Sequence, residues 1–267
     1  MFPYFTLFGK NIGLYPIMTL AGIFVAGIFF CRQVKKAGKD DNDAISFLLW
    51  SSLGVFLGGS VLYSLTNIEY YAYFAKVHNL PTFLKAMQIV FGGAVFYGGL
   101  IGGSLVGLFV MHKKKLDKSL YLDLSALFIP LFHGIARVGC FLGGCCYGIE
   151  SEFGFTAHGN DISPAVNDVC RFPVQLLETA GNLLIFALLF YLYRKRKMVG
   201  SLIYLYLGLY AILRFCDEFL RGDEVRGFVI GWLSTSQFIS IFAAAIALVG
   251  LIIRYKKRTE QKKHKIR

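Results

Sequence analysis

Charged side chains that could do chemistry lie within apolar stretches of this sequence. Arg137 follows His133 by four residues in one such stretch, and Arg214 precedes Glu218 by four residues in another. Residues four apart share a helix face, so Arg214 is predicted to pair with Glu218, and Arg137 to face the same cavity as His133. A guanidinium group matches the oxygens of a phosphate. The two arginines therefore predict a phosphate-bearing ligand, and the alternative is a salt-bridge network that only fixes helix packing.

Glycines and cysteines follow Arg137 in the run R-V-G-C-F-L-G-G-C-C-Y-G, which ends at Gly148. A helix tolerates few glycines, so this run predicts a broken helix or a loop. Non-helical backbone at membrane depth is allowed where it lines a cavity or is buried in protein. Its free N–H groups could then hold a phosphate or a carbonyl oxygen.

The cysteines leave several readings open. The six are Cys31, Cys140, Cys145, Cys146, Cys170 and Cys216. A disulfide, for instance to Cys170, or simple packing ranks first. A nucleophilic thiolate beside Arg137 ranks second. A metal site ranks third, because the C-x2-C spacing common in zinc sites is missing, and we expect no metal and no cofactor.

These residues must be positioned by membrane-spanning helices. Hydrophobic residues make up 56% of the 267-residue chain and charged residues only 16%, whereas a soluble domain has about 25% charged residues. The fold class predicted is an all-α integral membrane protein with about seven transmembrane helices and one transmembrane domain over residues 1–253. The expected spans are Tyr15–Cys31, Ala44–Thr66, Ile89–Met111, Leu120–Val138, Val174–Tyr193, Ser201–Leu220 and Val229–Ile253.

The net charge of +12 has an explanation in membrane topology. Most lysines and arginines follow the first, third, fifth and seventh spans, and the last group forms a basic tail over residues 254–267. The positive-inside rule then predicts the N-terminus outside and the tail in the cytoplasm. The first apolar run lacks a cleavage site and is read as a retained span. We expect contact with the membrane and no nucleic acid partner.

Four stretches carry a resemblance to the prolipoprotein diacylglyceryl transferase family of bacterial membrane enzymes. Phe96–Gly103 (F-Y-G-G-L-I-G-G) resembles the family segment H-G-G-L-I-G. Arg137–Gly148 resembles the signature R-x-G-N-F-x-N-x-E-x-x-G. Phe172–Glu178 (F-P-V-Q-L-L-E) resembles H-P-x-Q-L-Y-E, and Arg214–Asp223 resembles R-F-x-x-E-x-x-R. Family members have seven spans with the N-terminus outside, which matches the topology predicted above.

The resemblance implies a reaction and a set of roles. A diacylglyceryl group would move from phosphatidylglycerol, or a similar anionic phospholipid, to the thiol of a prolipoprotein cysteine in the bacterial cytoplasmic membrane. Arg137 and Arg214 would hold the lipid phosphate, and Glu218 would orient Arg214. The expected substrate-binding residues besides Arg137 are Gly139, Cys140, Gly148, Gln175 and Glu178.

The sequence departs from the family on the side of the acceptor. Tyr97 and Phe172 stand in place of two histidines, while Cys140, Gly143 and Cys145 replace the signature asparagines and glutamate. The Tyr97 hydroxyl could still hydrogen-bond, but it is a weaker base than a histidine at neutral pH, and His133 could take that role. The expected catalytic residues are therefore Arg137, Arg214, Glu218, Tyr97 and His133. Two alternatives follow: a paralogue with another outward-facing acceptor, such as a glycan, or a non-catalytic protein that binds an anionic lipid.

Overall fold

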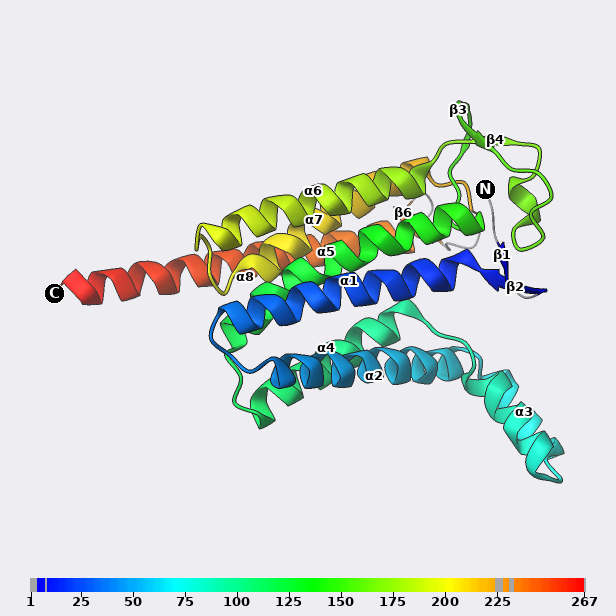
Figure 1. The fold of residues 1–267 in the computed structure, drawn as a ribbon, viewed down its shortest axis with the longest axis horizontal. Coiled ribbons are helices and arrows are strands. Elements are labelled where there is room, and N and C mark those ends of the chain that lie inside the picture. Colours follow the sequence, from blue (N-terminus) through cyan, green and yellow to red (C-terminus); the bar gives the residue numbers. More distant parts are fainter. Residues whose placement is uncertain (1–3, 8, 224–227, 231–232, 267) are drawn as a thin grey trace. The chain divides into compact units, whose positions relative to one another are not determined.

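The computed structural model describes residues 4–7, 9–223, 228–230 and 233–266, and it is mostly helical (Figure 1). Within these residues, five helices are long and apolar enough to cross a membrane. They are α1 (Leu14–Lys36), α2 (Asp41–Thr66), α5 (Lys118–Gly143), α6 (Val174–Arg194) and the first 26 residues of α8 (Thr235–Ile266). The other α-helices are α3 (Leu80–Phe91), α4 (Phe96–Lys113) and α7 (Leu202–Asp217).

The helices expose large apolar side chains that a water-soluble protein would bury. Phe24 on α1 is 66% exposed, Phe56 on α2 is 67% exposed, and Leu184 on α6 is 71% exposed. Exposed large apolar side chains on long apolar helices are expected where helices contact lipid. Together with the five long apolar helices, this exposure makes the chain a multi-pass membrane protein.

Short irregular elements connect the helices. The described part of the chain contains three 3-10 helices, η1 (Ile68–Lys76), η2 (Pro164–Val166) and η3 (Glu218–Leu220). Three antiparallel two-stranded sheets are formed by β1 (Tyr4–Leu7) with β2 (Lys10–Gly13), by β3 (Glu150–Thr156) with β4 (Cys170–Arg171), and by β5 (Phe228–Ile230) with β6 (Leu233–Ser234). The purely helical class predicted from the sequence is therefore correct only for the main body.

Three of the predicted spans differ from the helices observed. The span predicted over Ile89–Met111 is wrong as one helix, because α3 ends at Phe91 and α4 begins at Phe96. Val95 N–H donates to the carbonyl of Gly59 on α2 at 3.1 Å, so the broken backbone is satisfied by protein. The sixth span ends as the 3-10 helix η3. The last one becomes helical only at Thr235, and part of its predicted start, residues 231–232, lies outside the described residues.

The chain forms two compact units, and residues 31–118 make up one of them. Inside it, α2 and α4 pack through glycines. A Cβ atom at Gly98 would collide with the carbonyl oxygen of Gly58, and one at Gly102 with that of Gly54. Small residues let membrane helices approach closely enough for dispersion contacts to hold them together. The glycines at Gly98 and Gly102 therefore let α4 pack closely against α2.

The other unit contains residues 1–30 and 119–267, and it holds α5, α6, α7, α8 and most of α1. Its helices also meet at glycines. Gly134 on α5 faces Leu183 on α6, and Gly181 on α6 faces Leu213 on α7. Phe132 on α5 packs against Gly22 on α1. Close approach at these points aligns the helices side by side, so their ends gather at two opposite ends of the unit.

One end of this unit is a basic end. The buried carboxylate of Asp123 accepts hydrogen bonds from Gly200 N–H at 2.5 Å and Leu202 N–H at 3.0 Å, and so caps the start of α7. Arg258 on α8 donates to the Val199 carbonyl at 2.7 Å. Asp123 therefore caps the start of α7, and it lies far from Arg137 along α5. The opposite end carries the residues singled out from the sequence.

Candidate functional site

Arg137 is held by a buried carboxylate from the neighbouring helix. Its Nε lies 2.9 Å from Glu178 Oε2, and His133 Nε2 lies 3.4 Å from Glu178 Oε1. His133 and Arg137 are one turn apart on α5, and Glu178 projects from the first two turns of α6. The predicted shared face of His133 and Arg137 is confirmed, and one carboxylate meets both side chains.

Tyr210 on α7 completes this group. Its hydroxyl lies 3.5 Å from Glu178 Oε1, and its ring centre is 5.4 Å from that of His133. Three helices therefore meet around the carboxylate of Glu178, which faces His133 and Arg137 from α5 and Tyr210 from α7.

Arg214 is fixed near the end of α7. Its Nη2 lies 2.8 Å from Glu218 Oε2 and donates to Ser236 Oγ at 2.9 Å. The predicted pairing of Arg214 with Glu218 is confirmed. The other terminal nitrogen of Arg214, Nη1, is buried and has no hydrogen-bond partner in the described part of the chain. A buried guanidinium N–H favours an acceptor, which an anionic ligand can supply.

The end of α5 corrects one prediction. The helix does not break at Gly139 but continues to Gly143, because Gly139 lies where α1 approaches closely: a Cβ there would meet Met18 Cβ at 2.9 Å. The helix then ends in a Schellman motif. Cys145 N–H donates to the Cys140 carbonyl at 3.2 Å, and Gly144, at φ 78°, donates to the Phe141 carbonyl at 3.3 Å.

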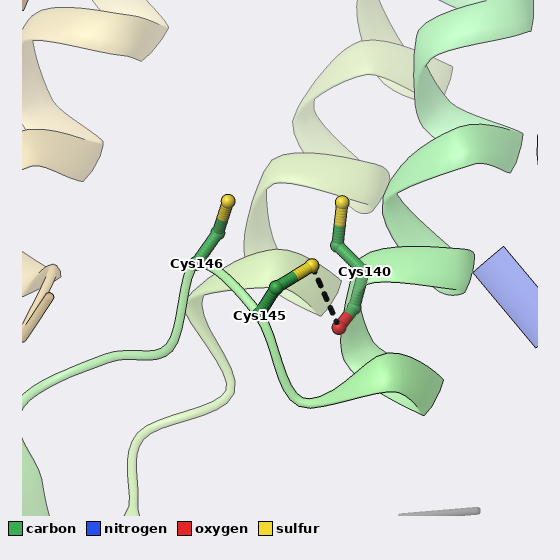
Figure 2. A group of neighbouring side chains, drawn as sticks. All are labelled: Cys140, Cys145 and Cys146. Carbon is green, nitrogen blue, oxygen red and sulfur yellow. Dashed lines mark hydrogen bonds between the residues drawn. The ribbon is translucent and has the colours of Figure 1, made fainter. Parts of the chain in front are cut away.

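This motif brings the cysteines together. A Schellman motif places the side chain two residues past the helix near that of the helix's last full turn, here Cys145 near Cys140. Cys146 follows with φ 53°, a left-handed conformation that costs a non-glycine residue about 1–3 kcal/mol. Figure 2 shows the three side chains converging, with Cys145 Sγ 3.7 Å from the Cys140 carbonyl oxygen. The three sulfur atoms all lie within 4.8 Å of one another.

All six cysteines are free, so the disulfide considered for Cys170 is not formed. Cys170 pairs with Thr156 in the sheet of β3 and β4 instead. Arg137 Nη1 lies 3.7 Å from Cys140 Sγ, so the cation next to this thiol is the one anticipated from the sequence. The absence of a C-x2-C motif therefore does not argue against a metal, because the turn brings the three sulfur atoms as close together as such a motif usually does.

Two further predicted residues shape the loop after the cysteines. Gln175 is buried, and its Nε2 donates to the Cys145 carbonyl at 2.9 Å. Gly148 bridges to Arg221, and a Cβ at Gly148 would collide with the Phe172 carbonyl oxygen and lie 3.0 Å from that of Leu220. Only glycine allows the backbone segments to come this close. Both residues fix the turn that carries Cys145 and Cys146.

Sequence reasoning missed residues that hold this loop. Asn160 is buried and donates from Nδ2 to the Gly143 carbonyl at 3.1 Å, closing the loop onto the end of α5. Arg171 lies over the Tyr147 ring at 4.4 Å and donates to the Gly148 carbonyl at 3.3 Å. Tyr210 gave no signal because an apolar helix rich in tyrosine does not reveal which ring faces a carboxylate.

Tyr97 belongs to the unit of residues 31–118. It lies in the first turn of α4 and is half-buried there. Its neighbours Gly98 and Gly102 make the close contacts with α2 described above. The hydroxyl role expected of Tyr97 stays a prediction.

These features define a class of protein: a multi-pass membrane protein whose helical bundle holds two half-buried arginines, each paired with a buried carboxylate. The family model described as prolipoprotein diacylglyceryl transferase matches residues 3–253. The chain therefore belongs to the prolipoprotein diacylglyceryl transferase family, a family of membrane-bound transferases.

Similar proteins extend over almost the whole chain. A phosphatidylglycerol–prolipoprotein diacylglyceryl transferase of Clostridium tetani is 33% identical over 255 residues, which are 95% of this chain and 98% of that protein. A second transferase of Clostridium perfringens is 33% identical over 258 residues, covering 93% of this chain and 92% of that protein. The Finegoldia magna transferase is 31% identical over 255 residues, covering 95% of each chain.

Proposed function

We propose that this protein transfers a diacylglyceryl group from phosphatidylglycerol to the thiol of a prolipoprotein cysteine. The observation that carries the proposal is the pair of braced arginines, because Arg214 keeps a buried Nη1 that lacks a protein partner among the described residues. An anionic lipid headgroup offers the missing acceptor. Family membership and the names of the similar transferases support the same substrates.

The chemistry needs stabilisation of a leaving phosphate. The acceptor thiolate attacks the diacylglycerol carbon that carries the phosphate. The bond between this carbon and the phosphate oxygen breaks, and glycerol 1-phosphate leaves. Arg137 and Arg214 stabilise the charge that develops on the leaving group, while Glu178 and Glu218 orient the two guanidinium groups. Removing one such donor from a preorganised site lowers the rate by about 10²–10³-fold.

The remaining predicted residues have supporting or proton-handling roles in this proposal. His133, beside Glu178, is the proposed base for the acceptor proton, and a contribution of Tyr97 is proposed on the family resemblance alone. Gln175 positions the turn through the Cys145 carbonyl. Gly139, Cys140 and Gly148 give the substrate-binding wall its shape.

We also propose seven spans in one transmembrane domain over residues 1–253, with α4 and α7 crossing besides the five long helices. Arg258 and Val199 meet at the basic end of the unit, which favours cytoplasmic placement of that end and of the tail at 254–267. The arginine site then faces outward in the bacterial cytoplasmic membrane, where a prolipoprotein cysteine is presented. Reporter fusions after residues 116 and 197 test this orientation: both should report the cytoplasmic side.

The decisive test uses purified protein in phosphatidylglycerol liposomes with a peptide containing a prolipoprotein cysteine. Release of glycerol 1-phosphate should equal the gain of diacylglyceryl mass on the peptide. Arg137→Ala and Arg214→Ala should lose most of this activity. Arg194→Ala is the matched control, since Arg194 is an exposed arginine at the other end of the same unit. Lipid binding without any release would favour the non-catalytic alternative.

The departures at Cys140 and Cys145 favour one alternative, a changed acceptor. In that case the arginines would still hold the lipid while the thiol peptide fails to react. The same liposomes with other outward-facing acceptors, such as a glycan, would then release glycerol 1-phosphate. Release that depends on the glycan and not on the peptide would replace the proposed acceptor.

A further inference from the structure

Cys140, Cys145 and Cys146 form a three-sulfur cluster at the end of α5. Cys140 is buried, and the other two are partly buried in the turn that follows. Figure 2 shows the sulfur atoms drawn together from two sides, from the helix and from the turn. Their mutual distances stay within 4.8 Å, and none of the three is in a disulfide.

The cluster is built by the backbone rather than by chance rotamers. The Schellman motif fixes Cys145 against Cys140, and Cys146, with its positive φ, follows in a partly buried turn. Gln175 secures this turn through the Cys145 carbonyl, and Asn160 secures the Gly143 carbonyl. A strained cysteine held by buried polar contacts indicates a functional constraint at this position.

The sulfur spacing suits a single thiophilic ion. Four thiolates at about 2.3 Å from a tetrahedral zinc lie about 3.8 Å from one another, so the cluster needs to contract by roughly 1 Å or less. Three protein ligands leave one position open, which is the pattern of catalytic zinc sites rather than structural ones. The positive charge of Arg137, 3.7 Å from Cys140 Sγ, offsets the net negative charge of a zinc ion bound to three thiolates.

We propose that Cys140, Cys145 and Cys146 bind one zinc ion, or a similarly thiophilic divalent ion, whose open position takes the acceptor thiol. The second half of this inference rests on the proposed transfer reaction. The acceptor cysteine loses its proton to His133, the proposed base, and binds as a thiolate. Its sulfur then forms a bond to the diacylglycerol carbon that carries the phosphate. At the same time the bond between this carbon and the phosphate oxygen breaks, and glycerol 1-phosphate departs.

The first experiment measures metal without any substrate. Full-length protein is purified in mild detergent under reducing conditions, its zinc content is measured, and the metal-free form is titrated with Co²⁺ while thiolate-to-cobalt absorption is followed. We expect about one ion per chain, with at least ten-fold weaker binding in Cys145→Ser and Cys146→Ser. Cys216→Ser is the matched control, because Cys216 is an exposed cysteine outside the cluster. Absence of binding by the reduced wild type, or unchanged binding in both cluster variants, overturns the proposal.

A second measurement uses only wild-type protein, so it tests the site even if the cluster variants fail to fold. Wild-type protein is alkylated with and without zinc, and the modified cysteines are mapped by mass spectrometry. Zinc should protect Cys140, Cys145 and Cys146 while Cys170 and Cys216 react equally in both samples. Equal modification of all five in both samples contradicts the site, as does recovery of a disulfide within the cluster that forms equally with and without zinc.

The acceptor step has its own readout. A prolipoprotein cysteine peptide added to the cobalt form should strengthen the thiolate absorption, and the same peptide with serine in place of cysteine should not. If transfer proceeds equally in metal-free protein, the proposed role of the ion in binding the acceptor fails while the proposed function stands. If the cobalt spectrum responds to the peptide but no glycerol 1-phosphate is ever released, the metal site stands and the proposed function fails.

Discussion

Replacing Glu178 by alanine should destabilise the protein far more than replacing an exposed glutamate. The Glu178 side chain is 3% exposed and faces both Arg137 and His133. Removing it leaves the Arg137 guanidinium, whose side chain is only 13% exposed, without its carboxylate. Breaking a buried pair in this way costs about 3–5 kcal/mol. At roughly 2–4 °C per kcal/mol, the unfolding midpoint should fall by about 6–20 °C.

The measurement is thermal unfolding in detergent, with transferase activity followed in parallel at a temperature where every variant is folded. Glu150→Ala is the matched control, because the Glu150 side chain is 73% exposed and lies 3.8 Å from Arg171 in a surface ion pair. Such pairs contribute about 0–1 kcal/mol, so the midpoint of this control should hardly move.

A double replacement separates stability from function. Arg137→Met combined with Glu178→Met removes both charges and fills the space with apolar atoms, so most of the lost stability should return while activity stays absent. The reasoning is refuted if Glu178→Ala melts together with the wild type. It is also refuted if the double variant is less stable than Glu178→Ala, because the ion pair would then be a net source of stability.

Three further outcomes are expected. Arg214→Lys should keep the charge but lose the fork that reaches Glu218 and Ser236, lowering kcat by about ten-fold or more with normal folding, as measured by glycerol 1-phosphate release. Gly102→Leu should block the approach of α4 to α2 and abolish folded protein on size-exclusion chromatography, whereas Leu105→Phe on the exposed face should be tolerated. Asp123→Ala should remove two N–H acceptors at the start of α7 and cost about 1–2 kcal/mol in thermal unfolding, which Asp123→Asn should partly restore.

The helices and the arginine pairs could be predicted because their signals are local. Apolar runs near 20 residues long predict spanning helices, and a spacing of four predicts the contact of Arg214 with Glu218. The contact of Arg137 with Glu178 joins two helices, and only the family resemblance brought Glu178 into the site. The break between Phe91 and Phe96 was missed because hydropathy does not register a backbone that leaves the helix and bonds to its neighbour.

The sequence contains a signal for the cysteine cluster that the prediction did not use. Gly144 in the sequence C-F-L-G-G-C is suited to end a helix in a Schellman motif, and that motif brings Cys140 and Cys145 together. The four glycines between Arg137 and Gly148 predicted a broken helix or a loop instead, because a helix tolerates few glycines. Gly139 is helical because α1 lies against it, a tertiary cause that no local pattern reports.

The guanidinium of Arg137 connects the two proposed sites, since Nε faces Glu178 and Nη1 faces Cys140. Three neutral thiols become a centre of net charge −1 when they bind zinc, so metal loading draws Arg137 toward the cluster and reduces the positive field available to a phosphate. Zinc should therefore weaken phosphatidylglycerol binding about five-fold or more, and by reciprocity the lipid should weaken zinc binding by the same factor. Arg214 limits this loss of lipid affinity, because it pairs with the Glu218 carboxylate and not with the cysteine cluster. If zinc tightened lipid binding instead, the phosphate would have to lie away from Arg137. The proposed role of Arg137 in holding the lipid phosphate would then be wrong, whatever the acceptor is.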